Sequence, residues 1–221
     1  MTPGPRPTGE IAVLGLLVNS ELAAFSRLAV DAAAAPELRD RLELARLGGV
    51  ATRRLERLAA RVAELGESLP DVVAPFLDTY VDLDARTPAT TWCERLLKAY
   101  VGYGVEDDVA RLLATALDDE ARGLVDDVLD DDGHAAFVVD RLTAAMGGDP
   151  VLASRLALWG RRVVGEALGV VQRLISDHDD LRALLTAALP PTESAGDLQQ
   201  RVFAVLTADH TRRMDRLGLT A

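Results

Sequence analysis

Apolar residues recur along this chain with a helical spacing. From residue 10 onward they are separated mostly by three or four positions, which places them on one face of an α-helix. No segment combines strict alternation of apolar and polar residues with β-branched enrichment, the pattern that indicates strands. The sequence therefore predicts an all-α protein in which the apolar stripes of several helices pack together as a bundle.

Proline and glycine set the expected limits of the helices. Residues 1–9 hold three prolines and two glycines, which predicts a flexible N-terminal arm followed by a single helical domain over 10–221. The expected helices cover residues 9–34, 36–65, 71–83, 88–117, 118–147, 151–176 and 197–217. Pro36 is expected in the first turn of its helix, and Thr87 is expected to cap the helix that begins with Pro88. The pattern indicates four core helices with additional helices on the C-terminal side.

Composition and charge narrow the classes of function. The 221 residues are 49% hydrophobic and 27% charged, enough to bury a core, but only 4% are aromatic. The formal net charge of −11 disfavours binding to nucleic acid through overall charge. Arginines cluster at 53, 54 and 57, at 161 and 162, and at 212, 213 and 216. Each cluster is expected to lie on a solvated helix face beside acidic residues.

The single cysteine and the N-terminal segment bear on the cellular compartment. Cys93 has no partner for an intrachain disulfide or a cysteine metal cluster. The N-terminus lacks the order of a secretory signal, and the apolar run 11–18 is too short to span a bilayer. We therefore expect a cytoplasmic protein that does not enter a membrane.

Three features match the metal sites that helical bundles build between facing helices. In such sites two helices each give one carboxylate, and two others each give a carboxylate and a histidine three residues apart. Glu21 lies in a stretch of otherwise apolar and small residues, Asp131 and His134 have the i, i+3 spacing of one helix face, and Glu166 lies in the stretch 160–168. Asp131 also fits a surface acid among neighbouring aspartates, and His134 fits a core histidine bonded to a carboxylate.

Five stretches resemble an actinobacterial ferritin-like family, often described as similar to the tRNA hydroxylase that acts on methylthio-isopentenyl-adenosine. They cover residues 15–25, 97–102, 133–137, 157–168 and 210–214, and the Leu-Trp-Gly-Arg-Arg run at 158–162 is the most specific. The resemblance implies a ferritin-like four-helix bundle. In members with intact ligands it implies a dinuclear iron site. It also implies a structural or supporting role for His210.

At the ligand positions the chain departs from that family. The second helix of the family usually carries Glu-x-x-His, and here the two positions hold Ala51 and Arg54. An Asp usually follows Tyr-Val-Gly, and here that position is Tyr103. Glu21, Asp131 and His134 remain as candidate metal ligands. Alanine has no donor atom, a guanidinium stays protonated, and a phenol with an ordinary pKa near 10 is a costly ligand.

Two further residues bear on this degenerate site. Asp107, one turn after Tyr103, could supply a displaced carboxylate, although the acidic run 106–108 fits a surface position more simply. We hypothesise that Arg54 occupies the space of the missing metal and pairs with Glu21 and Asp131, because arginine binds carboxylates in a planar, bidentate way.

Three functions remain open from the sequence. The first is a catalytically silent ferritin-like protein without a cofactor, which acts by interaction with a protein partner or a second copy of itself. The second is an iron-dependent hydroxylase or oxygenase with a reduced metal site, for which the resemblance implies tRNA as the substrate. The third is a small-molecule binding module in the bundle interior, which rests on fold analogy alone.

Overall fold

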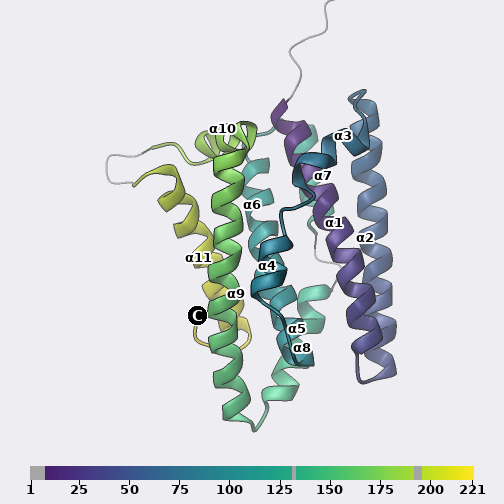
Figure 1. Ribbon diagram of the computed structural model, residues 1–221, viewed down its shortest axis with the longest axis vertical. Helices are drawn as coiled ribbons and strands as arrows, with labels where there is room; N and C mark the ends of the chain where they lie inside the picture. Colours follow the sequence, from purple (N-terminus) through teal and green to yellow (C-terminus); the bar gives the residue numbers. More distant parts are fainter. Residues whose placement is uncertain (1–7, 131–132, 192–195) are drawn as a thin grey trace, which may run out of the picture.

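The computed structural model describes residues 8–130, 133–191 and 196–221, and these residues form helices and loops with no strand (Figure 1). The elements are α1 (Thr8–Ala34), α2 (Leu38–Glu64), α3 (Leu69–Val73), η1 (Ala74–Phe76), α4 (Val81–Arg86), α5 (Trp92–Lys98), η2 (Ala99–Tyr103), α6 (Gly104–Ala114), α7 (Asp119–Val128), α8 (His134–Met146), α9 (Pro150–Asp177), α10 (Asp179–Ala188) and α11 (Leu198–Arg216). The all-α class is confirmed. Because α1 begins at Thr8, the last two residues of the expected arm are helical.

The helices α1 and α2 form the long antiparallel pair on one side of the bundle (Figure 1). Ion pairs join them at two levels, Glu10 to Arg61 at 2.7 Å and Glu21 to Arg54 at 3.9 Å. Glu10 and Glu21 are each only 5% exposed, so these carboxylates lie between the helices and not on the surface. The two arginines are seven residues apart and therefore share one face of α2.

The helices α7 and α8 lie antiparallel to α2. The ion pairs between them, from one end to the other, are Arg61 to Glu120 at 3.1 Å, Arg57 to Asp127 at 2.8 Å and Arg141 to Asp40 at 3.2 Å. The residue numbers rise on one side as they fall on the other, as an antiparallel register requires. Ion pairs therefore line the interface of α2 with α7 and α8 along its length.

The segments α5, η2 and α6 run end to end and complete the four-helix core. The long helix α9 packs along them, and α11 packs against both α6 and α9 (Figure 1). The additional C-terminal helices expected from the sequence at 151–176 and 197–217 are therefore α9 and α11. The segment η2 is a π-helical turn within the third core helix.

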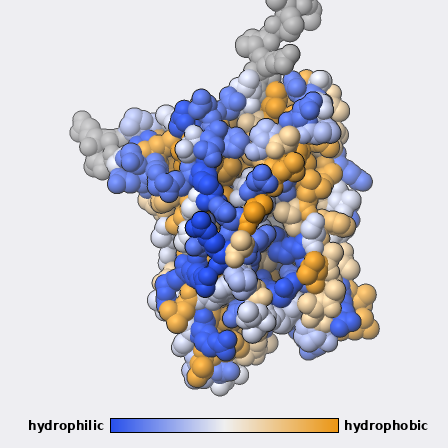
Figure 2. Space-filling model, viewed as in Figure 1, coloured by the Kyte–Doolittle hydropathy of each residue, from blue (hydrophilic) through white to orange (hydrophobic). Residues whose placement is uncertain are grey.

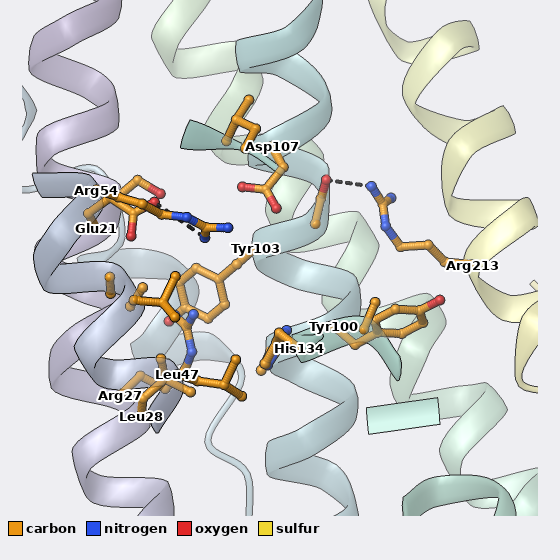
Figure 3. Close-up of a pocket in the computed structure, with 18 of the residues that line it drawn as sticks. Glu21, Arg27, Leu28, Leu47, Arg54, Tyr100, Tyr103, Asp107, His134 and Arg213 are labelled. Carbon is orange, nitrogen blue, oxygen red and sulfur yellow. Dashed lines mark hydrogen bonds and ion pairs between the residues drawn. The ribbon is translucent and has the colours of Figure 1, made fainter. Parts of the chain in front are cut away.

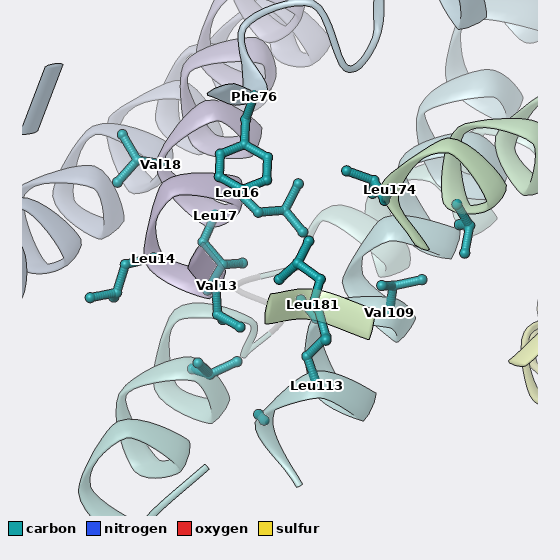
Figure 4. Close-up of a cluster of buried hydrophobic side chains, with 14 of the residues drawn as sticks. Val13, Leu14, Leu16, Leu17, Val18, Phe76, Val109, Leu113, Leu174 and Leu181 are labelled. Carbon is teal, nitrogen blue, oxygen red and sulfur yellow. The ribbon is translucent and has the colours of Figure 1, made fainter. Parts of the chain in front are cut away.

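The core consists mainly of leucine, valine and alanine, in keeping with the low aromatic content. One cluster joins Leu16 and Leu17 of α1 to Leu113 of α6 and Leu181 of α10, and each of these side chains is at most 1% exposed (Figure 4). A second cluster lies around α5, α8 and the lower part of α9. Several helices thus share each cluster.

Several helix boundaries differ from those expected. The helix α2 begins at Leu38, so Pro36 lies before it. Pro88 does not start a helix: α5 begins at Trp92, where Thr91 accepts a hydrogen bond from the Glu94 backbone N–H and the Glu94 side chain accepts one from Thr91. Thr87 is buried instead and donates to the Leu83 carbonyl oxygen. The expected helix 71–83 is split among α3, η1 and α4.

The expected helix 118–147 is two helices, α7 and α8. Gly133 precedes α8 with φ +105°, a left-handed conformation that glycine adopts without steric cost and that ends a regular helix. The sequence analysis also missed α10, which His178 separates from α9 in an extended conformation. Local turns, and not the apolar spacing, decide these breaks.

In the part of the chain that the structure describes, α1 is the one helix that is long and apolar enough to cross a membrane. Half of its most apolar window is buried inside the bundle, and the core helix of a globular protein meets the same criteria. We therefore describe α1 as a core helix.

Candidate functional site

A cavity of about 260 Å³ lies in the bundle between α1, α2, the third core helix, α8 and α11 (Figure 3). Its lining contains Glu21, Ala51, Arg54, Tyr103 and His134. The structure thus brings together five of the six positions that the sequence analysis assigned to metal ligands in the family. The sixth, Asp131, lies outside the described residues.

The Arg54 guanidinium points into this cavity from α2, toward the carboxylate of Glu21 (Figure 3). Its Nη1 lies 3.9 Å from Oε1 of Glu21, and its Nη2 donates a hydrogen bond to the carbonyl oxygen of Asp130 beyond the end of α7. Burial raises the pKa of Glu21 to about 7, although the charge of Arg54 acts in the opposite direction. The hypothesis that Arg54 pairs with Glu21 is confirmed, and its second half, the pair with Asp131, lies outside the described residues.

Tyr103 is already engaged on both its ring and its hydroxyl group. The hydroxyl donates to Oδ1 of Asp84 at 2.9 Å, and the guanidinium carbon of Arg27 lies 3.4 Å from the centre of the ring. Burial raises the pKa of the phenol above its ordinary value, so the phenolate is disfavoured further. The phenol is therefore a poor candidate for a metal ligand.

The acidic run 106–108 is not a surface run, and the interpretation made from the sequence was wrong. Glu106 is 8% exposed, and burial raises its pKa well above the usual range. Asp107 lines the cavity with its carboxyl pointing inward (Figure 3), and burial raises its pKa too. Burial raises the pKa of Asp108 to about 6 despite its pairing with Arg213. The π turn just before this run changes which side chains face inward, and no feature of the sequence predicted that turn.

The C-terminal arginine cluster also does more than form a solvated face. Arg213 is half-buried in the cavity wall, where its Nη2 donates to the Gly104 carbonyl oxygen at 2.6 Å and to Asp108. A Cβ atom on Gly104 would lie 2.6 Å from Nε of Arg213, so this approach requires glycine. Arg216 also lines the cavity, whereas Arg212 is exposed and pairs with Asp209.

The remaining candidates lie outside the lining. Glu166 pairs with Arg86 at 3.6 Å. His210 is 3% exposed, and burial together with the nearby Arg213 lowers its pKa to about 4, so it is neutral at ordinary pH. These surroundings fit a structural role for His210.

A comparison with protein-family models identifies the family to which this helical bundle belongs. The model for the ferritin-like domain of actinomycetes matches residues 8–188. The chain belongs to this ferritin-like family. The matched segment covers the bundle up to the end of α10, whereas α11, with Arg213 and Arg216, lies beyond it. No curated protein matches the chain.

In this ferritin-like chain the described residues do not fit a dinuclear iron site. No group of three His, Cys, Asp or Glu side chains among them is arranged to hold a metal ion. Ala51 offers no donor atom, the Tyr103 hydroxyl donates to Asp84, and the guanidinium of Arg54 lies 3.9 Å from the Glu21 carboxylate. We therefore derive no chemical step through iron.

The sequence analysis missed Arg27, Asp84 and Arg213 as residues of this site. Arg27 lies six residues after Glu21 on α1, a spacing that does not place the two side chains on one face of the helix, so the sequence carried no signal that Arg27 reaches this cavity. Asp84 and Arg213 come from distant segments, so only the fold brings them here.

Proposed function

We propose that this chain is a ferritin-like protein without diiron catalysis, in which an arginine-containing network replaces the metal site, and that it acts by binding. The observation that carries the proposal is the Arg54 guanidinium inside the cavity, 3.9 Å from the carboxylate of Glu21. Where diiron relatives would neutralise an inward carboxylate with a metal ion, this chain has a fixed cation.

Electrostatics supports the proposal. At an effective dielectric constant of about 20, a divalent ion about 4 Å from a guanidinium is repelled by about 8 kcal/mol. A mononuclear site built from the remaining candidate ligands would have to overcome that repulsion with fewer donors than a complete site. The guanidinium is permanently charged and cannot lose a proton to admit the ion.

The proposed binding role has a surface on which another protein chain could dock. Leu22, Phe25 and Val30 on the outer side of α1 are 42%, 48% and 56% exposed, at positions that share one side of the helix. Apolar residues gather over α1 and α2 on this face of the molecule, whereas hydrophilic residues follow α9 (Figure 2). We propose a protein partner for this face, with a second copy of the chain as the first candidate, and measurement of the molar mass in solution over a range of concentrations tests it.

The experiment that tests the absence of iron chemistry compares the chain with a variant whose ligand pattern is restored. Ala51→Glu, Arg54→His and Tyr103→Asp together recreate the family pattern inferred from the sequence. Both proteins are loaded anaerobically with ferrous iron, desalted and analysed for bound iron, and circular dichroism checks that each is helical. We expect iron to remain on the folded triple variant and not on the parent.

Two results would overturn the proposal. Stoichiometric iron on the parent, lost on His134→Ala, would favour the alternative function, an iron-dependent hydroxylase with a reduced site. A folded triple variant that takes up no iron would mean that these positions do not correspond to ligand positions.

A further inference from the structure

The cavity has an unusual balance of charge for this acidic protein. The described lining residues include five arginines and two carboxylates, although the whole chain has 24 basic and 35 acidic residues. The arginines are Arg27, Arg54, Arg111, Arg213 and Arg216, and they come from α1, α2, α6 and α11. A concave site with one dominant sign of charge concentrates ions of the opposite sign.

Two of these arginines have buried N–H groups that no described residue satisfies. Nε and Nη1 of Arg27 and Nη1 of Arg213 are buried and lack a hydrogen-bond acceptor among the described residues. Two buried carboxyl oxygens nearby, Oε2 of Glu21 and Oδ2 of Asp108, also lack a partner there. Buried polar groups in native proteins nearly always have a partner, and a charged donor without one is costly. The cavity wall therefore holds cationic residues whose hydrogen-bonding capacity the described residues do not fill.

The same residues are held rigidly. Arg27 stacks on the ring of Tyr103, which Asp84 fixes through the phenol hydroxyl. Arg213 is anchored through Nη2 to the Gly104 carbonyl oxygen and to Asp108, which leaves Nη1 for a further contact. Donors that are already oriented lose little conformational freedom when an anion binds.

The cavity wall also contains the π turn η2, which contributes Ala99, Tyr100 and Tyr103 to the lining. Such turns are rare and occur frequently at functional sites. This observation is independent of the charge count.

The rest of the lining is apolar and limits the ligand further. Leu28, Leu47 and Val50 form part of the wall on α1 and α2. Glu21 and Asp107 lie in the same cavity and repel a second negative charge on a ligand. The site thus favours one anionic group attached to an apolar body.

We propose that this cavity binds a small monocarboxylate with an apolar tail, whose carboxylate accepts hydrogen bonds from Arg27 and Arg213. The planar carboxylate matches the planar donor pair of a guanidinium. The proposal deepens the proposed function, because it assigns a ligand class to the cavity in which Arg54 replaces the metal.

The test uses the full chain, with octanoate and inorganic phosphate as probes, in isothermal titration calorimetry at constant ionic strength. We expect one octanoate per chain and weaker binding of phosphate. Arg27→Gln should weaken octanoate binding at least tenfold, since a hydrogen bond to a charged group is worth about that factor or more. Arg27→Lys should recover part of the loss, because the charge returns without the planar donor pair.

The matched control is Arg57→Gln, on the exposed face of α2, where Arg57 pairs with Asp127 and not with the cavity. This variant should bind octanoate as the parent does. If Arg27→Gln does not fold, Arg216→Gln removes an exposed arginine of the lining and should also weaken binding.

Three results would overturn the proposal: no octanoate binding at millimolar concentration, binding unchanged by Arg27→Gln or Arg216→Gln, or phosphate bound more tightly than octanoate. None of them bears on iron. If the chain takes up neither iron nor octanoate, the monocarboxylate site is refuted and the proposed absence of diiron catalysis is not. If the chain takes up stoichiometric iron, the proposed function is refuted and the monocarboxylate site is not.

Discussion

The pair between Arg54 and Glu21 makes the stability of the bundle sensitive to Arg54→Ala. The side chains of Arg54 and Glu21 are 21% and 7% exposed, so the substitution leaves an almost buried carboxylate without its nearest cation. Removal of one partner from a fully buried ion pair costs about 3–5 kcal/mol. That range is an upper bound here, because the two charged atoms are 3.9 Å apart and Arg54 retains some contact with solvent.

Protonation of Glu21 limits the loss further. The pKa of Glu21 in the folded protein is already about 7. If the substitution raises this pKa by one further unit, the folded state loses about 1.4 kcal/mol of stability at pH values above the raised pKa. Arg54 also donates to the Asp130 carbonyl oxygen, and loss of that bond costs about 1 kcal/mol at any pH. We therefore expect a loss of about 2–3 kcal/mol near pH 8 and about 1 kcal/mol near pH 5, where Glu21 is protonated.

Urea unfolding followed by circular dichroism at the two pH values measures both losses. Arg57→Ala is the matched control, because Arg57 and Asp127 form an exposed pair that should contribute about 0–1 kcal/mol. The double variant Glu21→Gln with Arg54→Ala isolates the coupling between the two residues. An Arg54→Ala protein as stable as the parent near pH 8, or a loss of equal size at both pH values, would refute the charge pairing.

Two further predictions concern stability. Because Glu21 and Asp108 have folded-state pKa values of about 7 and 6, above their ordinary values of 4.5 and 3.8, their protonation favours the folded state and their contribution falls as the pH rises from about 4 to 7. His210, whose pKa is lowered to about 4, acts in the opposite direction between about pH 4 and 6.5. Because Glu21→Gln removes one of the two carboxyl groups, the thermal midpoint of this variant should fall less than that of the parent between about pH 5 and 8. An equal fall would exclude Glu21 as a source of the pH dependence. Gly15→Ala places a Cβ atom 2.3 Å from the Val72 carbonyl oxygen and should lower the free energy of unfolding by about 1–2 kcal/mol, even after the better helix propensity of alanine is included. Gly165→Ala, at a position with open space, should raise the free energy of unfolding by up to about 1 kcal/mol. Urea unfolding compares the two variants, and equal effects would contradict the close packing of α1.

The long helices could be predicted because their apolar spacing persists over many turns. The limits of α1, α2, α9 and α11 lie within two residues of those expected, since proline, glycine and capping residues mark them in the sequence. The break at Gly133 and the separate helix α10 after His178 escaped. Within 118–147 the apolar spacing continues on either side of Gly133 and only the local backbone departs from the helix.

The candidate site was predictable in part, and mainly through the resemblance. It assigned Ala51, Arg54 and Tyr103 to ligand positions, and the structure places all three on one cavity. The inward orientation of Asp107 and the burial of Arg213 could not be inferred, because acidic and basic runs usually lie in solvent and only the packing of α6 and α11 turns them inward.

The π turn at Ala99–Tyr103 also has a consequence for how relatives of this chain should be aligned. A π turn holds one residue more than the α-helical turn it replaces, and one residue corresponds to about 100° of rotation around a helix. Deletion of a single residue here would rotate the whole of α6 relative to α5 and carry Asp107 away from the cavity. A one-residue gap in this segment therefore separates homologues that share the cavity chemistry from homologues that share only the bundle.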